Sequence, residues 1–436
     1  MQRTRSTPQS LMFSVLTFLV VPCQAELPQN DLPQINQDQL KIQHLEQQVQ
    51  DMQAEIQALA AAQPTESPKL AALEKINLWG YGEIYATRPH HSGQKAEADL
   101  ARAVFGIGYE FDALGRFNSE FETEHAVTSA VDRGEFEVEQ FYVDHDLGSR
   151  VGLTSGLFLI PAGFLNEAHE PTQFYGVERN FVESLIIPST WREGGLDLHG
   201  DTRFGLHWAT GLCTDQDLSQ WNFRPTQAIF SNALNLENNA IAPLQSTHQE
   251  LQLANAQHLA QFIALNYHGI PGLTLAGSLF SGLASTSANP GGNQRISLWE
   301  IHSRFISGPL DVTALYAHGG ISQTAGANAA NPAASHPMPA AFYGHYVQVA
   351  YTVLEWGHSH LNPFVRSERF NMASQYSSGV SPAAPAQAVW PAFADTVYTE
   401  GLNYYLNPQV VFKVDVQQYK NNRSFNRIDT GMGLAF

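Results

Sequence analysis

Three glutamates occupy every second position of one short segment: Glu120, Glu122 and Glu124. Their charge and regular spacing make them candidates for a functional site. In an extended strand, every second side chain lies on the same face, about 7 Å from the next. The row could be mistaken for a catalytic carboxylate set, but this spacing suits the charged wall of a pore. In a water-soluble sheet, the same three residues would form a solvated face.

Other motifs give no sign of catalysis or of a metal. The 17 histidines are scattered, and the close pairs His90-His91 and His358-Ser359-His360 read best as polar loop or turn segments. No HExxH, G-x-S-x-G or Walker sequence occurs. We therefore expect no catalytic residues, no metal and no cofactor, although barrel phospholipases and proteases carry sites that no short motif reveals.

Apolar residues at every second position dominate the sequence from Ile76 onward, as in Phe105, Ile107 and Tyr109. Seven tight turn signals alternate with eight longer connections near 87–96, 128–134, 161–194, 213–258, 282–294, 318–340, 371–394 and 420–426. Fifteen connections join sixteen strands, with the short turns on one rim and the long loops on the other. This order predicts an all-β fold, a transmembrane antiparallel β-barrel of about 16 strands over 76–436, with fourteen or eighteen as alternatives. A soluble β-sandwich or β-helix is the rival fold.

Composition narrows the function classes. The 436 residues contain 41 acidic and 23 basic side chains, for a formal net charge of −18, which disfavours nucleic acid as a partner. The two cysteines exclude a disulfide scaffold. The sequence contains no apolar run of 18 residues, so it predicts no helical membrane span.

Residues 1–25 predict a secretory signal, because Arg3 and Arg5 precede the apolar run 11–21 and a cut is expected after Ala25. A lipoprotein with Cys23 lipidated is the alternative.

Residues 26–62 predict a short periplasmic coiled coil that would hold an oligomer together. Its heptad seam consists of Ile42, Leu45, Val49, Met52, Ile56 and Leu59. The alternative is a single amphipathic helix. Residues 63–75, with Pro64 and Pro68, predict a linker.

The final strand alternates Ile428, Thr430, Met432 and Leu434 with polar or small residues and ends on Phe436. This pattern resembles the terminal signature of bacterial outer-membrane barrels. The resemblance implies outer-membrane lipid and the barrel assembly machinery, through Phe436, as partners.

The segment from Gly163 to Gly195 resembles the third-loop region of porins of the phosphate-selective (O/P-type) superfamily, and Pro363–Arg369 and Gly401–Tyr405 resemble strand motifs of the same group. The order of signal, coiled coil and barrel is also similar. The resemblance implies a homotrimeric channel of sixteen strands whose third loop folds inward and narrows the pore.

The charges depart from phosphate selectivity, because no lysine cluster is present. The expected constriction combines wall residues (Arg102, Glu120, Glu122, Glu124, Arg304, Arg366) with loop residues (Glu167, Glu170, Arg179, Glu183, Arg192, Glu193). Its excess of carboxylates predicts a passive outer-membrane diffusion channel with a weak cation preference. A structural or adhesive barrel tethered through its coiled coil, and an anion-selective porin, are the alternatives.

Overall fold

The computed structural model describes residues 32–61, 73–90, 95–111, 115–129, 134–224, 242–284, 292–377 and 394–436. The chain divides into two compact units, 1–70 and 71–436. The predicted signal, most of the predicted linker and the tip of the predicted turn at 112–114 lie outside the described residues.

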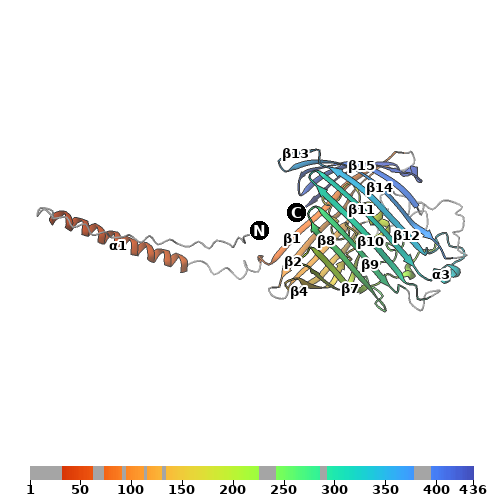
Figure 1. The fold of residues 1–436 in the computed structure, drawn as a ribbon, viewed down its shortest axis with the longest axis horizontal. Helices are drawn as coiled ribbons and strands as arrows, with labels where there is room; N and C mark the ends of the chain where they lie inside the picture. The colour runs from red at the N-terminus through yellow and green to blue at the C-terminus, as the bar shows by residue number, and fades with distance from the viewer. Residues whose placement is uncertain are drawn as a thin grey trace, which may run out of the picture. The chain divides into compact units, whose positions relative to one another are not determined.

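The first unit contains helix α1 (Leu32–Ala61), shown in Figure 1. Gln, Glu, Leu and Ala favour a helix, and Pro33 sits in the first turn, where its missing N–H costs nothing. The seam residues Ile42, Leu45, Val49 and Met52 are exposed, while the side chains of Ile56 and Leu59 lie outside the described set. The coiled coil therefore remains a prediction. Among the described helices, none combines the length and apolarity needed to cross a membrane.

The second unit is one antiparallel sheet that closes on itself (Figure 1). Within the described residues its strands are β1 (Ile76–Pro89), β2 (Glu97–Glu110), β3 (Arg116–Glu124), β4 (Glu135–Gly148), β5 (Val151–Leu159), β6 (Arg192–Asp201), β7 (Leu206–Thr214), β8 (Leu259–Ile270), β9 (Leu273–Gly282), β10 (Ile296–Ser307), β11 (Leu310–Ile321), β12 (Ala341–Tyr351), β13 (Leu354–Trp356), β14 (Ser359–Gln375), β15 (Ala394–Asn407), β16 (Val410–Tyr419) and β17 (Arg427–Ala435). Strand β1 pairs with both β2 and β17, which closes the barrel.

The strand count confirms the prediction of sixteen, with one small addition. Strand β12 pairs directly with β14, and the three-residue β13 folds back onto the start of β14 to extend the predicted tight turn at 355–357 into a hairpin. We call the rim that carries the seven tight turns the turn rim, and the rim that carries the eight longer connections the loop rim.

Alternation along each strand separates an apolar outer surface from a polar lumen. On β2, Phe105 and Ile107 are exposed on the outside, whereas Arg102 and Val104 point inward and are buried. Exposed aromatic side chains stack outside near the turn rim, where the ring centroids of Trp356 and Tyr404 are 5.7 Å apart. Nearer the loop rim, the tilted rings of Trp299 and Tyr316 lie with their centroids 5.4 Å apart. Apolar bands flanked by aromatic girdles are typical of membrane-spanning barrels.

The connection between β5 and β6, residues 160–191, folds into the lumen; we call it the third loop. Its π-helix η2 (Val182–Ile186) packs against β11, β12 and β14. Gly344 on β12 permits this approach, since a Cβ there would lie 2.9 Å from Val182 and Ile186. The loop's apolar residues form the buried core with Phe262, Phe280, Phe342 and Phe370 of the inner wall.

Candidate functional site

The third loop is anchored to the wall formed by β14 to β17. The amide of Val177 donates to Asp415 Oδ2 (2.6 Å), and the amide of Phe181 donates to Glu368 Oε2 (2.6 Å). In return, Arg366 Nη1 donates to the carbonyl of Tyr175 (3.1 Å). Because wall carboxylates satisfy loop amides that would otherwise be buried without partners, the loop is fixed across the lumen.

The same loop is also attached to the opposite wall and to itself. Arg102 Nη2 on β2 donates to the carbonyl of His169 (2.5 Å). Within the loop, Glu183 accepts from the amides of Phe164 (2.6 Å) and Leu165 (2.8 Å) and also from the hydroxyl of Tyr346 on β12 (2.9 Å). Glu183 is therefore an anchor of the loop and not a charge presented to passing ions.

A cavity of about 370 Å³ lies between the third loop and the wall formed by β1 to β4. The loop between β7 and β8 completes its lining. Among the described residues, seven glutamates and three arginines line it: Glu83, Glu122, Glu124, Glu135, Glu137, Glu178, Glu250, Arg102, Arg179 and Arg192. The cavity therefore carries an excess of carboxylates.

Two of the three arginines are neutralised by direct ion pairs. Arg102 Nε lies 2.8 Å from Glu83 Oε1, and Arg192 Nη2 lies 2.5 Å from Glu137 Oε2 and 3.1 Å from Glu250 Oε1. Arg179 forms no ion pair with any residue that the structure describes. Glu122 and Glu135 also have neither an ion pair nor a hydrogen bond among the described side chains.

One loop histidine has a pKa that limits how much positive charge it contributes. Burial lowers the pKa of His248, although the Glu250 carboxylate opposes the shift, so His248 is neutral at pH 7 and leaves the cavity acidic.

The structure brings together five of the predicted site residues in this cavity: Arg102, Glu122, Glu124, Arg179 and Arg192. Arg304 and Arg366 instead line a second cavity of about 130 Å³ between the third loop and β10 to β14. Glu193 is fully buried and accepts from Thr214 Oγ1 (2.5 Å), while Glu120 accepts from Trp79 Nε1 (2.5 Å). Glu167 and Glu170 lie on the third loop and line neither cavity.

Sequence reasoning missed the acidic residues of β4 and of the loop after β7. Glu135 and Glu137 alternate with Phe136 and Val138, the same pattern that identified the glutamates of β3, so this signal was present in the sequence. Glu250 follows no such pattern, because it lies in an irregular connection. Only the folded chain brings Glu250 to Arg192.

Comparison with known proteins identifies the fold. No family model matches the chain. An uncharacterized protein of Aquifex aeolicus (strain VF5) is 27% identical over 371 residues, which cover 83% of this chain and 80% of that protein. The structure of Salmonella typhi OmpF in complex with daunomycin has a TM-score of 0.56 at 12% identity and covers 83% of this chain and 97% of that chain. The trimer form of Vibrio cholerae OmpT has a TM-score of 0.47 at 8% identity and covers 83% of this chain and 98% of that chain. The likeness to OmpF shows that the second unit has the sixteen-stranded porin fold.

Proposed function

We propose that the protein is an outer-membrane porin, a passive diffusion channel for ions and small hydrophilic solutes with a weak preference for cations. The observation that carries this proposal is the inward third loop, which leaves an acidic cavity against β1 to β4. Solutes would move down their gradients, so the function needs no catalytic step. The apolar outer band and its aromatic girdles support a place in the outer membrane.

The cation preference follows from the charges that line the cavity. Carboxylates around a narrow, low-dielectric passage raise the local cation concentration and repel anions. Two unit charges 4 Å apart in water interact by about 1 kcal/mol, which corresponds to roughly a fivefold ratio. Because ion pairs neutralise some of the glutamates, we expect a cation preference of this small size and no absolute selectivity.

Planar bilayer recording tests the proposal directly. Purified protein should give discrete open steps, and the reversal potential in a KCl gradient should have the sign of a cation-preferring channel. Glu355→Gln, on exposed β13 outside the lumen, is the matched control and should leave the reversal potential unchanged. A silent bilayer would support the structural or adhesive alternative, and a clear anion preference would overturn the proposed selectivity.

We further propose that the protein belongs to the phosphate-selective (O/P-type) superfamily and forms a homotrimer. The third-loop and strand motifs, and the exposed seam of α1, support this assignment. Deleting residues 26–70 should weaken the trimer in native gels while the barrel stays folded. Trimers that resist dissociation equally well without these residues would show that the barrel walls alone hold them.

The proposed topology puts the loop rim outside the cell and the turn rim, with α1, in the periplasm. Leu253→Cys, on a fully exposed loop residue, should react with an impermeant thiol reagent on whole cells. Arg150→Cys, in the turn between β4 and β5, should react only after lysis. The native Cys213 is fully buried and should not contribute to labelling.

A further inference from the structure

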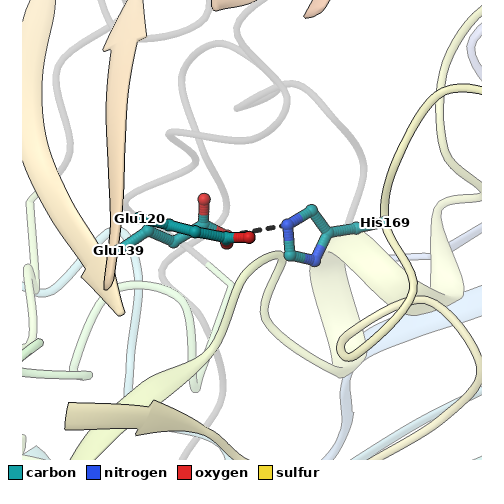
Figure 2. A group of neighbouring side chains, drawn as sticks. All are labelled: Glu120, Glu139 and His169. Atoms are coloured by element: carbon teal, nitrogen blue, oxygen red, sulfur yellow. Dashed lines mark ion pairs between the residues drawn. The ribbon is translucent and has the colours of Figure 1, made fainter. Parts of the chain in front are cut away.

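Three buried side chains from three different elements meet beside the third loop. Glu120 on β3, Glu139 on β4 and His169 on the third loop each offer a ligand atom, and these atoms lie within 4.8 Å of one another. Figure 2 shows both carboxylates directed at the imidazole ring. None of the three is more than 7% exposed. A metal ion is one occupant that such a set of donors could bind.

An irregularity in the sheet aims Glu139 at this point. Glu120 pairs with Gln140 and Phe121 pairs with Val138, so Glu139 is the extra residue of a β-bulge. A bulge re-aims a side chain relative to the regular alternation. Regular alternation along β4 places the half-buried Glu137 on the inner face, and the bulge adds the fully buried Glu139 to the same face.

Hydrogen bonds fix the orientation of the imidazole and its protonation. His169 Nδ1 lies 2.9 Å from the carbonyl oxygen of Asn166, which can only accept, so Nδ1 carries a proton. In the neutral ring, the lone pair of Nε2 then points toward Glu139 Oε1 at 2.8 Å and Tyr81 Oη at 2.5 Å. Glu139 Oε1 is fully buried and accepts no hydrogen bond of ordinary geometry from any described residue.

A carboxylate oxygen facing an imidazole lone pair at this distance needs a positive charge between them. A proton on Nε2 is one solution, and a divalent cation is the other. The surrounding groups resemble the outer shell of a metal site, since the far ring nitrogen donates to a carbonyl. Glu120 is held in the same way, by Trp79 Nε1 and Gln140 Nε2, each at 2.5 Å.

We propose that Glu120, Glu139 and His169 bind a divalent transition-metal ion such as Zn²⁺, which ties the third loop to the barrel wall. One imidazole nitrogen and two carboxylate oxygens suit zinc, whereas magnesium and calcium prefer oxygen alone. Tyr81 is placed to complete the coordination shell or to hydrogen-bond to it. Donor atoms in a tetrahedral zinc site lie about 3.3 Å apart, so the pair at 2.8 Å would open by roughly 0.5 Å.

The local charge is compatible with a dication. Arg102 and Arg192 are nearby cations, but each is already paired. Arg102 Nε is paired with Glu83 and its Nη2 is bonded to the carbonyl of His169, and Arg192 is paired with Glu137 and Glu250. Glu122 and Glu137, each two residues from a proposed ligand, line the acidic cavity beside the site. That cavity would raise the concentration of cations near the site.

Zinc binding to the full-length protein in detergent tests the proposal. After chelator treatment and dialysis, calorimetric titration with ZnCl₂ should show one ion per chain. Glu139→Gln and His169→Gln should each weaken binding by roughly tenfold or more. His302→Gln is the matched control, because His302 Nδ1 lies 2.7 Å from Glu300 Oε2 without a third donor, and zinc affinity should not change.

Absence of stoichiometric binding in the wild-type protein would overturn the proposal and leave a protonated His169 paired with Glu139. Unchanged affinity in folded Glu139→Gln and His169→Gln proteins would also overturn it. If either variant fails to fold, X-ray absorption spectroscopy of the zinc-loaded wild type gives a second readout. The spectrum should show an imidazole ligand, and a shell of oxygen alone would contradict the site. Conductance need not depend on the metal, so this result is separate from the channel proposal.

Discussion

The two walls of the lumen use charge in different ways. On the wall formed by β10 to β17, three inward-facing arginines are each paired with a carboxylate: Arg304 with Asp311 (2.6 Å), Arg366 with Glu368 (3.0 Å) and Arg427 with Asp429 (2.9 Å). On the wall formed by β1 to β4, Glu122 and Glu135 have no such partner among the described residues. The first wall holds the third loop in place, and the second wall presents charge to the cavity.

This difference shows why a count of lumen residues does not give selectivity. A buried ion pair is close to neutral at the distance of a passing ion, whereas the charge of an ionised carboxylate without such a partner is not offset by a neighbouring group. The arginines that would argue for an anion channel are mostly paired.

The largest expected effect comes from breaking an anchor. Arg366→Gln leaves Glu368 buried without its cation and also removes a hydrogen bond to Tyr175 of the third loop. Breaking a buried pair from one side typically lowers the free energy of unfolding by about 3–5 kcal/mol. Urea unfolding in detergent micelles measures the loss. Arg369 is exposed on the same strand, so Arg369→Gln is the control. Equal urea midpoints for the two variants would refute the anchoring role.

The second effect comes from removing the unpaired charge. The combined change Glu122→Gln and Glu135→Gln should reduce the cation preference by up to about fivefold, or roughly 1 kcal/mol. The reversal potential in a KCl gradient measures it. Stability should change less than in Arg366→Gln. A reversal potential equal to that of the wild type would show that these glutamates do not face the ion path.

A smaller effect separates free from paired arginines. Arg179→Gln removes the cavity arginine for which the described residues provide no ion pair, so the cation preference should rise by roughly twofold at low salt. The double change Arg304→Gln and Asp311→Asn removes both members of an ion pair and should leave the reversal potential unchanged. If the double variant shifts it as much as Arg179→Gln does, pairing does not neutralise these charges.

The smallest effect concerns pH. Because burial lowers the pKa of His248, its positive charge appears only as pH falls below the ordinary histidine range near 6.5. Acidification should then reduce the cation preference, with Glu250 and Arg192 as the charged neighbours. Glutamates also gain protons at low pH, so the informative quantity is the difference between wild type and His248→Gln. If the wild type and His248→Gln show the same change of reversal potential down to pH 5, His248 does not contribute to the charge of the cavity.

Much of the barrel could be predicted from the sequence because its causes are local. Alternation fixes which face of β2 and β3 is apolar, and turn residues separate the strands. The pairing of charges between elements could not be predicted, because partners such as Glu178 and Arg427 come from distant strands and loops. Glu120 shows the limit clearly: alternation places it on the inner face, but Trp79, which lies over Gly106, removes it from the ion path.

The pairing of β1 with β17 has a consequence for how the barrel assembles. Every other pairing of the ring joins strands that follow one another along the chain, most of them through short connections, whereas Tyr81 must meet Ala435 across nearly the whole barrel sequence. Contacts of such high sequence separation form slowly. Until this pair forms, both strands expose unpaired backbone groups, and a partly assembled sheet is a template for wrong pairing. We therefore expect seam closure to be the slowest step of folding and the one most vulnerable to aggregation.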